Sequence, residues 1–321
     1  MKYLKLLRLP NLLMVTLTMY LMRFFIIRPM LGINSFELQL SELDFFILVM
    51  ATVLITAAGY VINDYFDTRT DLLNRPETVV VGKSLHRRVA IRLHIVLTVL
   101  GVAAGFFVSY KIQLQSLGFT YVFVSGILWF YSTNYKRQFL IGNIIVAFLS
   151  ALVPLMVFLY ELPLLNKTYG QIMLANHANF NFLLYWGLGY AFFAFITTLN
   201  REIIKDVEDF EGDKAYGMNT LPVNLGIAKS KWIIGFISAV IILAIGFAYI
   251  RFFYTEATGV DYPTLFYFIL LLIQPMIFLI VKLIKAKNKK DYHFLSSLQK
   301  YVMLLGILYA VLVKFLIEKR F

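Results

Sequence analysis

The stretch "FFILVMATVLITAAGYVINDYFDTRTD", residues 45–71, changes character at a single point. Residues 45–62 are apolar and carry no charge, and an apolar segment of about 20 residues can cross a hydrocarbon core about 30 Å thick. The polar residues that follow are rich in oxygen, and they would lie where a membrane helix leaves the bilayer. These oxygen-bearing side chains are Asn63, Asp64, Asp67 and Asp71.

Apolar segments of this kind recur along the whole chain. Of the 321 residues, 60% are hydrophobic, 17% aromatic and only 15% charged, whereas a soluble domain carries about a quarter charged residues. The segments are continuously apolar, which favours helices over the alternating pattern of a membrane barrel. The sequence therefore predicts an all-α, polytopic membrane protein with one domain, 1–321. The nine predicted spans lie near 9–29, 43–62, 89–109, 117–134, 139–160, 180–200, 231–252, 263–284 and 299–317.

Composition argues against several other classes of protein. The absence of cysteine removes disulfides, thiolate catalysis and cysteine zinc sites, and the four histidines are too scattered to predict a zinc or haem site. The net charge of +12 does not indicate a nucleic-acid partner, because most of the 30 basic residues fall on one predicted side of the membrane. The positive-inside rule makes that side cytoplasmic. The basic segment 282–290 is expected to contact anionic lipid headgroups.

A second acidic stretch, "REIIKDVEDFEGD" at residues 201–213, repeats the spacing of the first. Asp206, Asp209 and Asp213 form the same D-x-x-D-x-x-x-D pattern, and residues at i, i+3 and i+7 share one face of a helix. The segments 63–77 and 201–213 together hold 10 of the 18 acidic residues. Each stretch follows a span that is expected to run from outside to inside, so both motifs are predicted at the cytoplasmic edge.

Carboxylates gathered on two facing helix ends require a cation. At about 6 Å and an effective dielectric near 20, each like-charged pair costs roughly 3 kcal/mol. Oxygen ligands without histidine or cysteine suit Mg²⁺, which often binds one or two carboxylates together with substrate phosphates. The alternative is that these carboxylates lie at solvated helix ends and form ordinary salt bridges with neighbouring basic residues. We interpret them as Mg²⁺ ligands that hold a diphosphate whose hydrocarbon tail lies in the membrane.

These residues resemble the UbiA superfamily of intramembrane prenyltransferases. "NDYFDTRTD" and "KDVEDFEGD" resemble its two aspartate motifs, and "RLPN" (8–11), "NRP" (74–76) and "YSTNYKRQFLIGN" (131–143) agree with it. The resemblance implies nine helices around a central cavity, a need for Mg²⁺, and transfer of a polyprenyl group from its diphosphate to an acceptor. Within the superfamily, "REIIKDVEDFEGD" is most similar to members that prenylate geranylgeranylglyceryl phosphate.

The resemblance, together with the residue types, assigns roles. One Mg²⁺ would be held by Asn63, Asp64, Asp67 and Asp71, and a second by Asp206, Asp209 and Asp213. The metals would neutralise charge on the departing diphosphate, and cations would contact the phosphates. The residues expected to be catalytic are Asp67, Asp71, Asp206, Asp209 and Lys205. Those expected to bind substrate are Asn11, Arg75, Lys136, Arg137, Asn143 and Lys205.

One segment departs from the family pattern. Members often read R-P-x-x-S-G after the first motif, but here Val81-Gly82 replaces Ser-Gly, which puts in doubt a hydroxyl contact from this loop. The departure creates "GKS" at 82–84, yet a nucleotide-binding loop needs glycine at position 77, where this chain has Glu77. A nucleotide-binding loop is therefore not predicted.

Two other functions remain open at this point. An aromatic-acceptor prenyltransferase of quinone biosynthesis, of the 4-hydroxybenzoate or homogentisate type, would share both motifs. An ion-coupled transporter would be expected to place its acids near the bilayer midplane, whereas both motifs here lie at helix ends. We expect an integral protein of the cell inner membrane whose active site faces the cytoplasm. Its expected partners are a polyprenyl diphosphate, a lipid-soluble acceptor and membrane lipids, with no nucleic acid.

Overall fold

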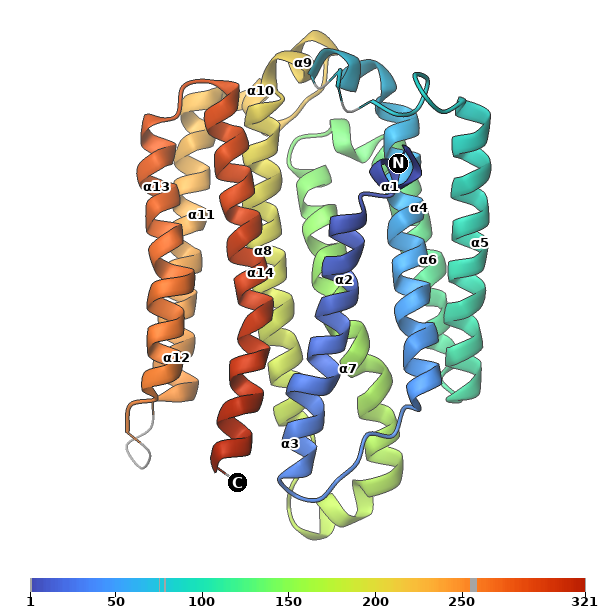
Figure 1. Cartoon of the computed structure of the whole chain (residues 1–321), viewed down its shortest axis with the longest axis vertical. Coiled ribbons are helices and arrows are strands. Elements are labelled where there is room, and N and C mark those ends of the chain that lie inside the picture. Colours follow the sequence, from blue (N-terminus) through green and yellow to red (C-terminus); the bar gives the residue numbers. More distant parts are fainter. Residues whose placement is uncertain (1, 75, 78, 255–258, 321) are drawn as a thin grey trace. The chain divides into compact units, whose positions relative to one another are not determined.

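The computed structural model describes residues 2–74, 76–77, 79–254 and 259–320, and its regular elements there are helical (Figure 1). The long helices, with the π-helical segments that continue them, are α2 (Leu9–Leu21), η1 (Met22–Ile27), α3 (Arg28–Gly32), α4 (Glu42–Asn74), α5 (Arg87–Lys111), α6 (Gln115–Thr133), α7 (Ile141–Ala175), α8 (Asn181–Glu208), α11 (Ile227–Ala248), η3 (Tyr249–Phe253), α12 (Tyr262–Tyr267), η4 (Phe268–Ile273), α13 (Gln274–Lys285) and α14 (Lys289–Arg320). The short connecting helices are α1 (Lys2–Leu6), η2 (Tyr135–Arg137), α9 (Phe210–Ala215) and α10 (Leu221–Leu225).

Each of the nine predicted spans coincides with a helix in the described ranges. Eight of these helices are long and apolar enough to cross a membrane. The remaining one, α6, has 19 residues and is about 28 Å long, but its serine, threonine and glutamine residues lower its hydropathy. The predicted fold class, an all-α polytopic membrane protein, is confirmed.

The chain groups into two compact units. Unit 1 contains residues Met1–Lys136 and Leu152–Leu188, and unit 2 contains Arg137–Ala151 and Gly189–Phe321. The chain passes from one unit to the other between Lys136 and Arg137, and again within α7 and within α8. These two helices therefore contribute to both units.

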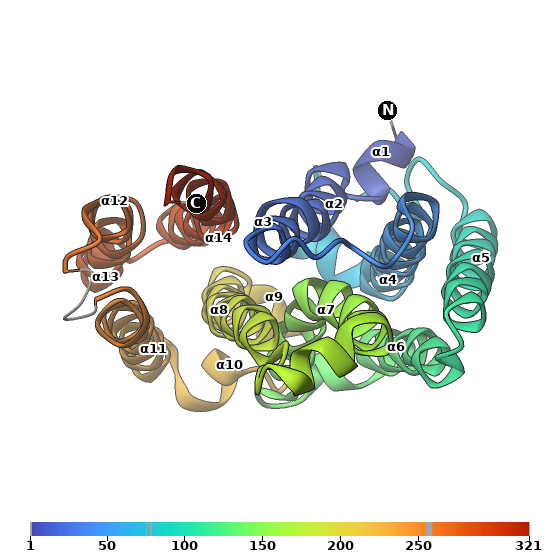
Figure 2. The same ribbon diagram turned by 90° about the horizontal axis from the view of Figure 1, so that it is seen from below.

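In unit 1, α4, α5 and α6 pack side by side, as both views show (Figures 1 and 2). Two glycines of α5 make the approach possible. A Cβ atom at Gly101 would lie 2.8 Å from the side chain of Ile55 on α4, and one at Gly105 would lie 2.2 Å from the ring of Tyr121 on α6. Small residues at helix interfaces allow this close packing.

A buried ion pair holds the other end of unit 1, far along α4 from the first motif. Arg23 of η1 donates to Glu161 of α7 at 2.8 Å, and each side chain is only 1% exposed. Arg23 also donates to the backbone carbonyl of Leu40, and its guanidinium lies 4.6 Å from the ring centroid of Phe45. The pair thus joins η1 to α7 and to the segment that leads into α4.

The loop after α4 is held by apolar packing. Val80, Val81 and Leu85 are buried in one cluster with Leu6 of α1 and Val61 of α4. Gly82 adopts φ +82°, a conformation that side chains with a Cβ rarely take. The Val81-Gly82 departure thus places a buried apolar side chain and a tight turn at this point of the loop.

In unit 2, buried amides join three helices. Asn200 of α8 donates to Ser238 of α11 at 3.0 Å and to Gln299 of α14 at 3.2 Å, and all three residues are fully buried. Further along α14, a Cβ atom at Gly306 would lie 2.0 Å from the ring of Phe193 on α8, so the two helices also approach closely there. Polar side chains buried at membrane depth need such partners, and the amides therefore fix α8 against α14.

Candidate active site

The first motif lies on the last turns of α4. The helix continues without interruption from Glu42 to Asn74, beyond the apolar run that ends at residue 62. Asp64 and Asp67 therefore lie on one helix, and their side chains are each 16% exposed. A helix C-terminus carries partial negative charge, so acids are unfavourable there unless cations compensate them. The predicted helical placement of this motif is confirmed.

Two cations from distant segments compensate these acids. Arg8 donates to Asp64 at 2.8 Å, and Lys136 of η2 donates to Asp67. The Lys136 side chain is only 8% exposed, so its ion pair with Asp67 is shielded from water. Lys136, predicted as a phosphate ligand, is thus placed directly at the first motif.

Arg8 is not among the predicted site residues, although it begins the "RLPN" segment that resembles the family. It precedes α2 with φ 51°, an uncommon conformation for a residue other than glycine, and its guanidinium lies 5.0 Å from the ring centroid of Tyr60. Burial lowers the pKa of Arg8, but Asp64, Tyr60 and Asp71 together outweigh burial and raise this pKa above its ordinary value. Arg8 therefore stays positively charged beside two acids of the motif.

Asn63 places a side-chain oxygen without a hydrogen-bond donor at the end of α4, next to these carboxylates. Its Oδ1 atom is buried and has no hydrogen-bond partner among the described residues. A buried acceptor without a donor is costly and calls for an explanation. A hard cation is one, because amide and carboxylate oxygens are the ligands that Mg²⁺ prefers. The donor set of Asn63 with its neighbouring carboxylates fits such an ion.

The second motif is not carried by one continuous helix, as the sequence had predicted. α8 ends at Glu208, Asp209 stands between two helices with φ −99° and ψ 9°, and α9 begins at Phe210. The predicted continuous face is therefore wrong at Asp209. Asp and Gly are weak helix formers, and the "EDFEGD" segment contains both. The backbone nonetheless keeps a bond from Asp209 N to Lys205 O at 2.9 Å, so the turn remains tight.

The acids of the second motif have one neutral and one charged partner. Asn143 of α7 donates its amide to Asp206 at 2.8 Å. Lys289 at the start of α14 lies 3.7 Å from Asp209, and Asp213 is buried. Next to the motif, the buried Glu208 pairs with His293 at 3.0 Å. Asn143, predicted to bind substrate, contacts a motif carboxylate directly.

The other predicted substrate ligands are placed less closely. Lys205 pairs with Glu202 at 2.9 Å. Arg137 is exposed, and its backbone carbonyl accepts a hydrogen bond from Asn219. Asn11 is half-buried on α2, and Arg75 lies outside the described residues. The structure thus connects Lys136 and Asn143 to the motifs.

No three acidic or histidine side chains in the described part of the chain are close enough to hold a metal ion by themselves. The first motif belongs to unit 1 and the second to unit 2. Mg²⁺ in phosphate-handling enzymes commonly takes one or two carboxylates and completes its shell with waters and phosphate oxygens. The donor sets therefore fit a metal that is bound together with a diphosphate.

Comparison with known proteins gives the family. The model of the UbiA prenyltransferase family matches residues 34–304. Digeranylgeranylglyceryl phosphate synthase of Methanothermobacter thermautotrophicus is 32% identical over 230 residues, 71% of this chain and 68% of that protein. The enzyme of the same name from Sulfolobus acidocaldarius is 36% identical over 190 residues, 59% of this chain and 60% of that protein.

Solved structures agree with this match. A digeranylgeranylglyceryl phosphate synthase aligns with a TM-score of 0.60 at 22% identity, covering 97% of this chain and 98% of that one. A UbiA homologue from Archaeoglobus fulgidus, bound to DMAPP and Mg²⁺, aligns with a TM-score of 0.58 at 16% identity, covering 97% and 99%. At these identities the likeness shows a shared fold. By its sequence match and its fold, the chain belongs to the UbiA prenyltransferase family and is a prenyltransferase of the membrane.

Proposed function

We propose that the chain transfers a geranylgeranyl group from its diphosphate to geranylgeranylglyceryl phosphate, with Mg²⁺ as cofactor. The observation that carries the metal and the diphosphate is the oxygen-only donor set at the end of α4, where Asn63 Oδ1 is buried with no hydrogen-bond partner among the described residues. The acceptor is inferred from the relatives, which include digeranylgeranylglyceryl phosphate synthases that are 32% and 36% identical.

In this proposal the two motifs hold one metal ion each. The first would use Asn63, Asp64, Asp67 and Asp71, and the second Asp206, Asp209 and Asp213. A related UbiA protein was solved with Mg²⁺ and a prenyl diphosphate, which supports this assignment. Bound Mg²⁺ would supply positive charge to the diphosphate oxygens as the leaving group departs.

The two cations that pair with the first motif, Arg8 and Lys136, also bind the diphosphate in this proposal. Arg8 and Lys136 now neutralise Asp64 and Asp67. When the carboxylates bind metal, these two side chains become available to the diphosphate oxygens. Arg suits bidentate phosphate contacts, and Lys acts as a point charge. Arg75 and Arg137 remain proposed phosphate ligands from the adjoining loops.

The transfer itself makes one bond and breaks one. The hydroxyl oxygen of the acceptor bonds to C1 of the prenyl group, the bond from C1 to the diphosphate oxygen breaks, and diphosphate leaves. The hydroxyl proton is lost, and a carboxylate of the second motif is the group on this chain that would accept it. Either Asp206 or Asp209 can fill this role.

The acceptor is tested by competition. Purified protein in lipid nanodiscs receives labelled geranylgeranyl diphosphate, Mg²⁺, and equal concentrations of geranylgeranylglyceryl phosphate and 4-hydroxybenzoate. We expect the label in the glyceryl lipid, and none in any product when excess EDTA is present. Preferential prenylation of the aromatic ring would reject the lipid acceptor and favour the quinone-pathway alternative. Full turnover in EDTA would reject the metal assignment.

We also propose that both motifs face the cytoplasm, a prediction based on the distribution of basic residues. The naturally cysteine-free chain allows single-cysteine labelling. Lys83→Cys and Tyr216→Cys lie in exposed positions after the two motifs, and Asn166→Cys is an exposed control near the far end of α7. In intact cells an impermeant reagent should label only the control. Labelling at position 83 or 216 without permeabilisation would contradict this orientation.

A further inference from the structure

The short helix α1 packs against the loop that follows the first motif, and both views place it beside α4 (Figures 1 and 2). Leu6, its last residue, is fully buried in one cluster with Val61 of α4 and with three residues of the loop, Val80, Val81 and Leu85. Lys5 Nζ donates to the backbone carbonyl of Glu77 at 2.8 Å. A helix of five residues is not stable alone in water, so these contacts hold α1 in place.

Arg8 connects α1 to α2 in an uncommon backbone conformation. Its φ of 51° and ψ of 52° lie in the left-handed region, which is unfavourable for a residue with a Cβ atom and persists only where the surroundings impose it. Its N–H donates to Lys5 O at 3.1 Å, and its carbonyl accepts from Asn11 N at 2.8 Å. Arg8 is therefore fastened to α1 on one side and to α2 on the other, so the position of α1 sets the direction of its side chain.

The loop beneath α1 also contacts the helix that carries the first motif. A Cβ atom at Gly82 would lie 3.2 Å from Thr68 Cγ2, and Thr68 directly follows Asp67. Gly82 N donates to Leu85 O at 2.8 Å, which closes the turn. The turn that departs from the family pattern thus joins α1 to α4 at the level of the first motif.

The guanidinium of Arg8 reaches the first motif next to this packing. It donates to Asp64 at 2.8 Å and lies 5.0 Å from the ring centroid of Tyr60. Val61, which packs in the cluster with Leu6, precedes Asp64 by one helical turn, and residues three apart are neighbours on a helix surface. The apolar cluster and the ion pair therefore lie side by side on α4.

We infer that Lys5 and Leu6 are positioning residues for Arg8: by holding α1 on the turn at 80–85, they keep the guanidinium where the diphosphate binds. The inference rests on the proposed function, which assigns Arg8 to the diphosphate oxygens, and deepens it. Neither Lys5 nor Leu6 touches the substrate. A contact that is ordered in advance costs less entropy on binding than one that the ligand must order. Without the packing of Leu6, Arg8 keeps its charge but binds the diphosphate more weakly.

The experiment is a double-mutant cycle that is read by binding and not by turnover. Isothermal titration calorimetry in lipid nanodiscs, at one fixed Mg²⁺ concentration, gives the Kd of inorganic diphosphate for the wild type, Leu6→Ala, Arg8→Gln and the double variant. We expect Leu6→Ala to raise this Kd about fivefold to tenfold, as coupled residues do. In the Arg8→Gln background the same change should alter the Kd by less than about twofold.

Matched variants separate positioning from general damage to the fold. Leu31→Ala removes a leucine that is as deeply buried, on α3 at the other end of the first membrane span, and should leave the Kd unchanged. Leu6→Met keeps the apolar volume and should restore most of the affinity. If Leu6→Ala does not fold, Lys5→Met removes an exposed hydrogen bond without creating a cavity and should raise the Kd about threefold. That rise should also disappear in the Arg8→Gln background.

The possible failures are distinguishable. An unchanged Kd in both Leu6→Ala and Lys5→Met would overturn the inference, and so would a rise by the same factor with and without Arg8, because α1 would then support only the fold. If Arg8→Gln binds diphosphate as the wild type does, the phosphate role of Arg8 fails and the inference fails with it. If the wild type does not prenylate the glyceryl lipid, the proposed acceptor is refuted instead, and this cycle, which uses no acceptor, still decides the role of α1.

Discussion

At the end of α4 the carboxylates of the first motif are paired with two cations from distant parts of the chain. Arg8 is 56 residues from Asp64, and Lys136 is 69 residues from Asp67. At the end of α8, by contrast, Asp206 receives a hydrogen bond from the neutral amide of Asn143. Asp64 and Asp67 are thus held by cations, whereas Asp206, at the matching place in the second motif, is held by a neutral amide.

The difference shows how the carboxylates of each motif are compensated when no metal is bound. Asp64 and Asp67 of the first motif are already paired with cations, so a metal ion must displace Arg8 and Lys136 from these carboxylates. Asp206 of the second motif keeps its hydrogen-bonded amide and has no such displacement to make. We therefore expect loss of a carboxylate to have similar effects on catalysis in the two motifs and opposite effects on stability.

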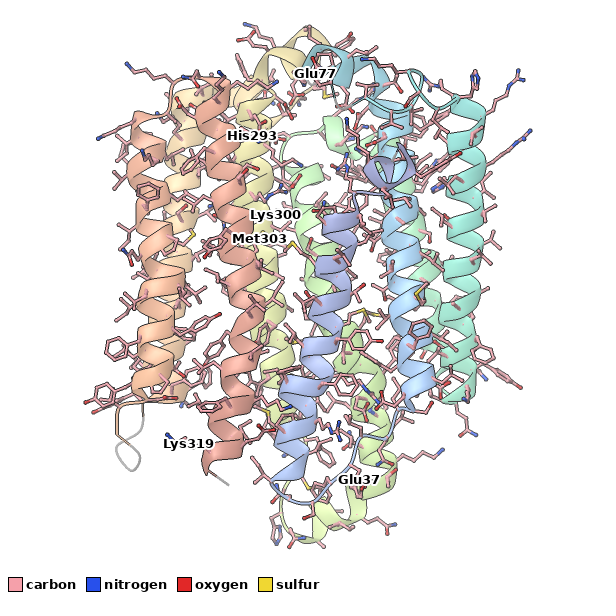
Figure 3. All side chains as sticks on the ribbon, in the orientation of Figure 1. Glu37, Glu77, His293, Lys300, Met303 and Lys319 are labelled. Carbon is pink, nitrogen blue, oxygen red and sulfur yellow. The ribbon has the colours of Figure 1, made fainter. Side chains whose placement is uncertain are left out.

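The largest effect is expected from removing a motif carboxylate. Asp67→Asn and Asp206→Asn should each lower the rate of prenyl transfer about a hundredfold to a thousandfold, because charge stabilisation of the leaving group is lost. The measurement is single-turnover transfer at saturating Mg²⁺. Glu37→Gln is the control, since this exposed acid lies at the other end of unit 1 from Glu77 (Figure 3). Near-normal rates in either motif variant would refute the metal roles.

The same two variants should differ in stability. Asp67→Asn leaves Lys136 buried without its carboxylate, which should lower the free energy of unfolding by about 3 kcal/mol. Asp206→Asn removes a buried charge that accepts its hydrogen bond from the neutral amide of Asn143, so the stability should stay constant or rise. Thermal unfolding in EDTA tests this contrast. Equal destabilisation of both variants would show that the negative charges of Asp67 and Asp206 are compensated in the same way.

A smaller effect is expected from the amide that holds the second motif. Asn143→Ala removes the hydrogen bond to Asp206 and should cost about 2 kcal/mol, the usual range for a bond to a charged group. Its KM for Mg²⁺ should rise, because the carboxylate loses its orientation. Titration of activity with Mg²⁺ measures this shift, and Asn166→Ala, an exposed position on the same helix, serves as the control. An unchanged titration curve would argue against an orienting role.

The smallest effect is expected at the exposed side of the second motif. Lys289 lies 3.7 Å from Asp209, and its side chain is 45% exposed. An exposed ion pair of this kind contributes at most about 1 kcal/mol. Lys289→Gln should therefore change the free energy of unfolding by less than about 0.5 kcal/mol, which denaturant unfolding can measure. A loss comparable to that of Asp67→Asn would place Lys289 inside the site.

The sequence predicts the helices and the position of the first motif well, because both depend on local pattern. Long apolar runs require helices in a bilayer, and "NDYFDTRTD" continues the helix that precedes it. The same reasoning is wrong at Asp209, where α8 ends. Spacing alone does not show how Asp209 and Gly212 weaken a helix that is no longer supported by lipid.

The pairing partners are harder to predict, because they are set by tertiary contacts. Arg8 lies 56 residues from the acid that it neutralises, and no periodicity links the two. Asn143 could be proposed from sequence because an amide in an apolar run is itself conspicuous.

The buried pair of Arg23 and Glu161 bears on how the protein is made. The two residues are 138 positions apart, and at a synthesis rate of about 5–20 residues per second the arginine waits roughly 7–28 s for its partner. An arginine at the centre of a membrane helix costs about 2.5–3.5 kcal/mol to insert. We therefore expect the first span to remain shallow, or sheltered by the insertion machinery, until α7 emerges from the ribosome. Biogenesis would then join η1 to α7 in one late step.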